Sequence, residues 1–218
     1  RGLALTGIAG GLVSSTAVTL GFARQSRERG ATHDALAAGL LLAWTVMFGR
    51  IAVEVAVVHR PLLPELAAPL ALMALGTLGA AIVLHVRVRR ERSVERRAEV
   101  EFKNPFRLMA SIRFALLFTL VLLAVELARR RVPERGLYLV AGLAGLTDVD
   151  AITLSMAKLA RGGGDASVAV GSIVTAALTN TVVKCGLVVA LGARALARRV
   201  AVATAAILVA GIAALLIL

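Results

Sequence analysis

The apolar residues of this chain occur in long runs that do not alternate with polar residues. The runs lie at about 35–58, 65–88, 108–128, 167–192 and 200–218, and less regular runs cover 3–23 and 136–160. A run of roughly 20 apolar residues lets an α-helix cross a hydrocarbon layer about 30 Å thick. A membrane β-barrel needs short alternating segments instead. The pattern therefore predicts an all-α fold, a polytopic bundle of transmembrane helices.

Composition and charge agree with a membrane protein. Hydrophobic residues make up 59% of the 218 residues, and the mean hydropathy is +0.86, well above the level of ordinary soluble domains. The formal net charge of +12 does not indicate nucleic-acid binding, because most Lys and Arg residues lie in the connections between apolar runs. In that position they orient a polytopic protein and meet anionic lipid headgroups. We therefore expect the lipid bilayer and its anionic headgroups as partners, and no nucleic acid.

The chain contains an internal repeat with an offset of 134 residues. When residues 1–30 are compared with residues 135–164, 12 of the 30 positions are identical without a gap, and "RGLAL" falls on "RGLYL". The same offset pairs Arg50 with Lys184 and Ser14 with Asp148. We interpret this as a duplication.

The repeat divides the chain into three parts. Residues 1–87 form a first membrane repeat, 88–107 a basic surface connection and 108–218 a second membrane repeat. In the second copy a span at 108–128 precedes "RGLYL", so we expect an equivalent helix before Arg1 in the natural protein.

The Gly-rich segments at 3–23 and 136–160 leave two arrangements open. If both cross the membrane, each repeat has four spans and the repeats are parallel. If both are broken or re-entrant, each repeat has three crossings and the repeats are inverted. The distribution of basic residues favours the second arrangement, and inverted repeats with broken helices recur in transporters.

Few ionisable residues fall within the apolar runs, where each costs at least about 2.5–3.5 kcal/mol unless it is paired or faces a polar cavity. Arg50 and Glu54 are four residues apart on one helical face and can pair with each other. Lys184 occupies the position equivalent to Arg50, with Asn180 one turn before it. We expect Arg50, Glu54 and Lys184 to act as counter-charges, either in permanent structural pairs or in pairs that break when an ion binds.

Asp148 and Asp150 stand out within "AGLTDVDAITLSMAK". Side chains two residues apart point about 200° apart on a helix, so they converge only in an unwound turn. There the two carboxylates, Thr153 and freed backbone carbonyls would suit a cation or a proton. The alternative is that Asp148 caps the next helix and Asp150 stabilises its first turn.

The first copy has hydroxyl groups where the second has acids. Ser14, Ser15 and Thr16 supply either a helix cap or the neutral half of a site whose acidic half is Asp148 and Asp150. Including Asn180, these are the candidate ion- or substrate-binding residues, with Asp148 and Asp150 as candidate metal ligands. No cofactor is expected beyond a bound cation of unknown identity.

No enzymatic chemistry is indicated. No Ser-His-Asp or Cys-His arrangement falls at suitable positions, and "RGGGD" at 161–165 lacks the Lys-Ser/Thr of a nucleotide-binding loop.

The stretches "GLVSSTAVTLGFARQSR" (11–27), "NPF" (104–106) and "GLYLVAGLAGLTDVDAITLSMAKLA" (136–160) together resemble a bacterial family, the C-terminal membrane domain of MgtC/SapB-family proteins. The resemblance implies a multi-pass protein of the prokaryotic inner membrane with a separate MgtC-like helical domain upstream. It implies no reaction and no substrate.

Two functions follow as hypotheses. The first is a transport protein for a small cation, or for a solute moved by a cation or proton. The second is a non-transporting membrane module. It would form a homo-oligomer, or would join or regulate a larger membrane complex, through small residues such as Gly39 and Gly171.

Overall fold

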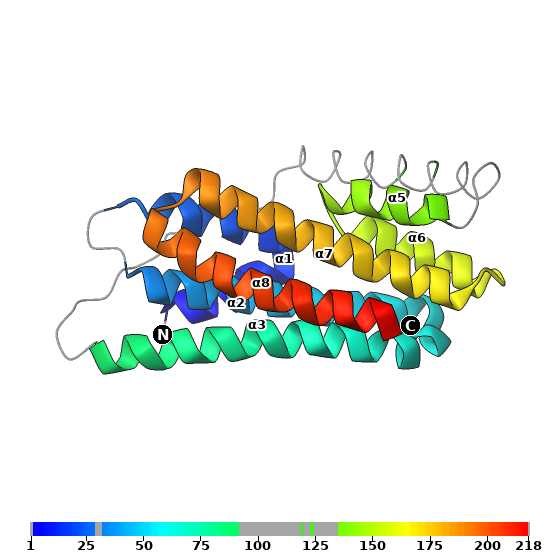
Figure 1. Cartoon of the computed structure of the whole chain (residues 1–218), viewed down its shortest axis with the longest axis horizontal. Helices are drawn as coiled ribbons and strands as arrows, with labels where there is room; N and C mark the ends of the chain where they lie inside the picture. The colour runs from blue at the N-terminus through cyan, green and yellow to red at the C-terminus, as the bar shows by residue number, and fades with distance from the viewer. Residues whose placement is uncertain (1, 29–31, 92–118, 120–122, 124–134, 218) are drawn as a thin grey trace. The chain divides into compact units, whose positions relative to one another are not determined.

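The computed structural model describes residues 2–28, 32–91, 119, 123 and 135–217, and the regular structure in them is helical (Figure 1). The helices are α1 (Gly2–Gln25), α2 (His33–His59), the short 3₁₀ helix η1 (Arg60–Leu62), α3 (Leu63–Glu91), α5 (Arg135–Gly145), α6 (Asp150–Arg161), α7 (Ala166–Leu191) and α8 (Arg194–Ile217). The all-α prediction is confirmed over these residues. The predicted connection beyond residue 91 and the predicted span 108–128 lie outside them, apart from positions 119 and 123, which are helical.

Four helical stretches in the described residues are long and apolar enough to cross a membrane: Gly2–Gln25, His33–Val88, Ala166–Leu191 and Arg194–Leu215. The stretch His33–Val88 contains both α2 and α3, which have 27 and 29 residues and so are each long enough to span. α8 begins at Arg194 rather than at the predicted residue 200. The helix extends through its basic first turns, which hydropathy alone does not count as part of a span.

The described chain divides into two compact units that each combine distant parts of the sequence. Unit 1 comprises Arg1–Gly49, Ala71–Lys103 and Thr181–Ala210, and unit 2 comprises Arg50–Leu70, Asn104–Asn180 and Gly211–Leu218. Because α2 and α7 each contribute to both units, each unit contains residues from both proposed repeats.

In unit 1, α1 is a helical hairpin and not a straight helix. Ser14 has extended torsion angles, φ −163° and ψ 107°, within an otherwise helical segment. A Cβ atom on Gly39 of α2 would lie 2.6 Å from the carbonyl oxygen of Leu3 and 2.8 Å from Cε2 of Phe22. In a straight helix Leu3 and Phe22 would be about 28 Å apart. The chain therefore turns back at Ser14, so the length of α1 is not that of a straight span.

The contacts of α1 along α2 give the same result. In its first half, contacts move up α2 as the residue number rises, whereas in its second half they move down. The first-half pairs are Gly7 with Gly39 and Gly11 with Ala43, and the second-half pairs are Thr19 with Trp44 and Ser26 with His33. The first half is thus parallel to α2 and the second antiparallel to it.

In unit 2, α5 and α6 form a second hairpin. They have 11 and 12 residues, about half the length of a membrane span, and they contact each other. Figure 1 shows them side by side, joined at one end by residues 146–149. α5 also packs closely on α7, because a Cβ atom on Gly145 would lie 2.4 Å from the carbonyl oxygen of Ala176. Both Gly-rich segments are therefore broken helices, the arrangement that the sequence favoured over two full spans.

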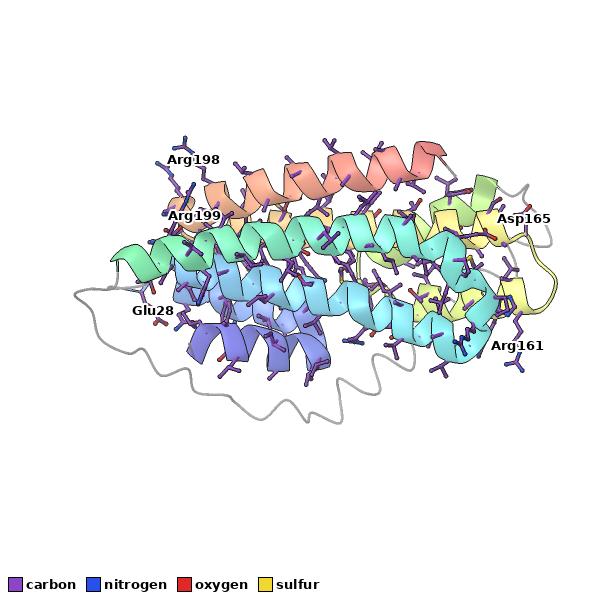
Figure 2. The ribbon with its side chains drawn as sticks, turned by 90° about the horizontal axis from the view of Figure 1, so that it is seen from below. Glu28, Arg161, Asp165, Arg198 and Arg199 are labelled. Atoms are coloured by element: carbon purple, nitrogen blue, oxygen red, sulfur yellow. The ribbon has the colours of Figure 1, made fainter. Side chains whose placement is uncertain are left out.

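Several charged side chains lie at helix ends, as Figure 2 shows for Arg198 and Arg199 near the start of α8, for Arg161 at the end of α6 and for Asp165 just before α7. The Asp165 carboxylate caps α7 by accepting hydrogen bonds from the Ser167 hydroxyl and from the Ser167 and Val168 N–H groups. These bonds, led by that of the Ser167 hydroxyl, hold the pKa of Asp165 below its ordinary value. The capping contribution is therefore present at neutral pH and is lost only as the pH falls through this lowered pKa.

Large apolar side chains are exposed along the helices, with Val57, Leu139 and Val209 at 79%, 72% and 70% exposure. An aqueous surface rarely tolerates so many exposed apolar groups, whereas hydrocarbon does. The helices therefore present lipid-compatible faces.

The hairpin in α1 depends on the absence of side chains at its contact with α2, which Gly7→Ala tests. A Cβ atom at position 7 would lie 2.1 Å from the carbonyl oxygen of Gly39. We expect Gly7→Ala to destabilise the protein by about 1–3 kcal/mol, seen as a lower midpoint of thermal unfolding in mild detergent. Gly21→Ala in the same helix meets nothing within 4 Å. It should leave the midpoint unchanged or raise it slightly, because Ala favours helix by up to about 1 kcal/mol. Equal effects of the two substitutions would contradict the hairpin packing.

Candidate functional site

The tip of the α5–α6 hairpin is irregular backbone whose polar groups are largely satisfied by neighbouring residues. The N–H groups of Thr147 and Asp148 both donate to the carbonyl of Ala144, at 3.0 Å. The Asn180 amide of α7 donates to the carbonyl of Gly145 at 2.9 Å. Asn180, predicted as a ligand-binding residue, thus caps the C-terminus of α5 by satisfying a carbonyl that has no partner within that helix.

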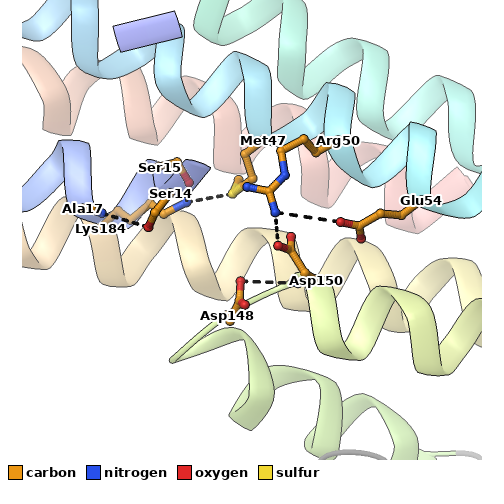
Figure 3. Close-up of polar contacts among 9 residues, drawn as sticks. All are labelled: Ser14, Ser15, Ala17, Met47, Arg50, Glu54, Asp148, Asp150 and Lys184. Carbon is orange, nitrogen blue, oxygen red and sulfur yellow. Dashed lines mark hydrogen bonds and ion pairs between the residues drawn. The ribbon is translucent and has the colours of Figure 1, made fainter. Parts of the chain in front are cut away.

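Two predicted site residues meet at this tip. Asp150, the first residue of α6, forms an ion pair with Arg50 of α2. The N–H of Asp150 donates to Oδ1 of Asp148 at 3.4 Å, a long contact. Asp148 therefore contributes a weak cap to α6, and Val149 at the N-cap position provides no side-chain cap. Figure 3 shows both carboxylates at the start of α6.

Glu54 adds a third carboxylate to the cluster in unit 2. Its Oε1 lies 3.9 Å from Nη2 of Arg50, so one guanidinium faces both Asp150 and Glu54. The other oxygen, Oε2 of Glu54, is buried and has no hydrogen-bond partner among the described residues. Three carboxylates and one guanidinium thus lie together in unit 2, as Figure 3 shows.

Thr153, another predicted ligand residue, lies in α6. It lies three residues after Asp150 in α6, which puts both on the same helical face. Its side chain is fully buried, and its hydroxyl has no hydrogen-bond partner within the described residues. A buried hydroxyl in that state is a free oxygen ligand.

In unit 1, the tip of the α1 hairpin carries hydroxyl groups. The Ser14 hydroxyl caps the second half of α1 by accepting a hydrogen bond from the N–H of Ala17 at 3.2 Å. Lys184 of α7, which is only 1% exposed, donates to the Ser15 hydroxyl and to Sδ of Met47, both at 2.7 Å. Thr16 is half-buried. A buried ammonium group thus meets the tip of the first hairpin.

Sequence reasoning missed several contacts that hold unit 1 together. Nε1 of Trp44 donates to the Thr19 hydroxyl at 3.0 Å, and Arg199 forms an ion pair with Asp34. Asp34 and Arg199 are 165 residues apart in the sequence. A charge in the first turn of a span gives no signal of so distant a partner.

No preassembled metal centre is found in the part of the chain that the structure describes. Within it, no group of three or more His, Cys, Asp or Glu residues lies close enough together to hold a metal ion. Arg50 instead provides the positive charge beside Asp150.

The helices define the class of the protein as an all-α, multi-pass membrane protein with broken helices. The chain belongs to the family described as "Domain of unknown function (DUF4010)", which matches residues 1–192. An uncharacterized protein of Aquifex aeolicus (strain VF5) is 28% identical over 195 residues, covering 89% of this chain and 84% of the relative. No solved structure matches the chain.

The ion pair between Arg50 and Asp150 makes a quantitative prediction. Arg50→Met leaves the Asp150 carboxylate without its guanidinium, so the free energy of unfolding should fall, and Asp150→Asn in the same background should restore part of it. We expect a coupling energy of about 1–3 kcal/mol in this double-mutant cycle, measured by detergent-induced unfolding. Arg198→Met, at the exposed start of α8, should change stability by less than about 0.5 kcal/mol. Strictly additive effects would show that the two side chains do not interact.

Proposed function

We propose that this protein transports a small cation across the membrane, or uses a cation or proton gradient to move a solute. The observation that carries the proposal is the gathering of three carboxylates around the guanidinium of Arg50, beside the α5–α6 tip. Arg50 and Glu54 lie on α2, a helix long enough to span a membrane, Asp150 begins α6, and Asp148 lies in the break before it. Ionisable groups are expensive in such surroundings and usually mark ion or proton pathways, which supports a site that a cation or a proton enters.

The hairpin architecture supports the same function. Irregular backbone at membrane depth is tolerated where protein or a water-filled cavity surrounds it, and transporters place binding sites at such breaks. In this site Asp148 and Asp150 would supply charged oxygens and Thr153 a neutral one. Arg50 would act as the counter-charge that an arriving cation displaces. A transporter of this kind requires no enzymatic reaction.

The two hairpins support the proposed duplication. The offset of 134 residues places Ser14, the break in α1, on Asp148, which lies in the break between α5 and α6. It also places Gly11 on Gly145, and their close contacts, Ala43 and Ala176, agree with the offset to within one residue. We propose that each repeat contributes one re-entrant hairpin and that the repeats are inverted. The contact of Lys184 with Ser15 in unit 1 is then comparable to that of Arg50 with Asp150 in unit 2, although the offset aligns Thr16 and not Ser15 with Asp150.

The proposed cellular setting follows from the family and the relative. We place the protein in the prokaryotic cytoplasmic membrane, in contact with anionic lipid headgroups through its basic connections. We also propose that the chain is related to the C-terminal membrane domain of MgtC/SapB-family proteins, which its sequence resembles.

A second function is favoured by one observation. Asp150 is held by Arg50, and Asp148 accepts a hydrogen bond from the backbone. A permanent pair of this kind would suit a non-transporting module that assembles as a homo-oligomer or regulates a membrane complex. In that case Arg50 would never leave Asp150.

Flux measurements on reconstituted protein distinguish these functions. Liposomes carrying indicators for Na⁺, K⁺, Mg²⁺ and pH report movement of each cation. We expect uptake of at least one of them by the unmodified protein, and a loss of at least tenfold in Asp148→Asn and Asp150→Asn. Asp165→Asn, at the exposed cap of α7, is the matched control and should retain the flux. Full flux in both tip variants, or no flux with the unmodified protein, would reject the transport function.

A further inference from the structure

The start of α8 carries three arginines, which differ in their contacts. Arg199 is half-buried, forms an ion pair with Asp34 and donates a hydrogen bond to the carbonyl of Ala195 at 2.8 Å. Arg194 and Arg198 are exposed, and neither makes an ion pair or a hydrogen bond within the residues that the structure describes. Figure 2 shows the Arg198 side chain extending away from α8. These two guanidinium groups are therefore available to a ligand.

The charge at this end of unit 1 is mainly positive. α8 contains no Asp or Glu, so no acid on the same helix balances its exposed arginines. The connection after α1 adjoins the start of α8, because the N–H of Ala193 donates to the Ser26 hydroxyl at 2.8 Å. The end of α1 and this connection add the exposed Arg24 and Arg27, together with the exposed acid Glu28. A phosphate is therefore attracted to this surface, where a guanidinium can donate two parallel hydrogen bonds to it.

Beyond the exposed arginines, α8 presents an apolar face. Val202, Ala205 and Val209 follow Arg198 at intervals of four, three and four residues, which places all four on one side of the helix. The three apolar residues, which we call the α8 stripe, are exposed, with Val202 at 69% and Val209 at 70%. Because α8 is long and apolar enough to cross a membrane, lipid tails can cover this stripe.

The length of the α8 stripe matches one leaflet of a bilayer. Val209 is eleven residues after Arg198, which corresponds to about 16 Å along a helix. The hydrocarbon core is about 30 Å thick, so one leaflet contributes about half of that depth. When Val209 is near the middle of the bilayer, Arg198 is thus at the level of the headgroups, and Arg194 is one turn further out.

We propose that this face of α8 is a binding site for one anionic phospholipid. The phosphate contacts Arg194 and Arg198, and an acyl chain lies along the α8 stripe. The headgroup charge complements two guanidinium groups without an internal partner, and the stripe has the length of the lipid tail region. The site lies on a helix face and not in a connection, and it does not depend on the proposed transport function.

The site also defines the orientation of α8. Anionic lipids give the cytoplasmic leaflet a negative surface potential, and basic residues of membrane proteins concentrate on the cytoplasmic side. α8 therefore begins at the cytoplasmic leaflet and runs toward the opposite one. Ala195, an exposed residue in the first turn, lies on the cytoplasmic side in this orientation.

The test counts the lipids that remain bound to the full chain, by native mass spectrometry, after incubation with equal amounts of phosphatidylglycerol and phosphatidylcholine. We expect the unmodified protein to retain phosphatidylglycerol in preference to phosphatidylcholine. The preference should fall about fivefold in Arg198→Gln, which is the effect of one basic residue near a headgroup. Arg198→Lys keeps the charge and should retain most of the preference, which separates charge from folding.

Arg161→Gln is the matched control. Arg161 is also exposed, lies at the end of a helix and makes no ion pair or hydrogen bond within the described part of the chain. The residues of α6 before it are mostly buried, so no apolar stripe adjoins it. Arg161→Gln changes the net charge by the same amount and should leave the lipid preference as in the unmodified protein.

Three results would overturn the lipid site. The first is an equal loss of preference in Arg161→Gln and Arg198→Gln, which would reduce the effect to general charge attraction, and the second is no preference in the unmodified protein. The third is a disulfide between two copies of Ala205→Cys in a Cys185→Ser background, because a second chain would then cover the stripe. Ala195→Cys in the same background should react with an impermeant thiol reagent only from the cytoplasmic side, and reaction from the other side would overturn the orientation.

Discussion

A helix that stops inside an apolar segment leaves backbone groups without intrahelical partners, and the candidate site depends on how the α5–α6 hairpin satisfies them. The Asn180 amide of α7 donates a hydrogen bond to the carbonyl of Gly145, and the N–H groups of Thr147 and Asp148 donate to the carbonyl of Ala144. Once these groups are satisfied, the break is stable enough to hold Asp148 and Asp150 two residues apart without the 200° separation that a regular helix would impose. The arrangement of the acidic residues is thus a consequence of the break.

The break also determines which charges meet. Arg50 pairs with Asp150 and lies one helical turn from Glu54, so a single guanidinium serves two carboxylates. In unit 1 the corresponding break carries serine hydroxyls, and the buried ammonium of Lys184 donates to one of them. Each unit therefore combines a hairpin tip with a basic side chain from a long helix. The acids are confined to the second tip, which makes that tip the better candidate for a cation.

The sequence was sufficient for the helical class and for the polar residues near the breaks, because membrane helices must be apolar and buried charge is rare. It favoured broken Gly-rich segments but left full spans open. It was insufficient for the partners. The (i, i+4) spacing indicated Arg50 with Glu54, whereas the contact of Arg50 with Asp150 joins residues 100 apart. The sequence suggested Lys184 as a counter-ion for the aspartates, and the structure adds contacts with Ser15 and Met47 that no local pattern predicts. Hairpin geometry likewise depends on glycine contacts between neighbouring helices, such as Gly7 with Gly39, which no local pattern predicts.

The central claim is that the α5–α6 tip is a water-accessible cation site and not a sealed structural turn. The most direct measurement is the reactivity of Thr147→Cys, in a Cys185→Ser background, toward a membrane-impermeant thiol reagent in liposomes. The account predicts that this tip position reacts from one side of the membrane and is protected by Na⁺ or K⁺, while Leu139→Cys on the exposed apolar face of α5 does not react. A tip cysteine that reacts from neither side would contradict the account and make the aspartates structural.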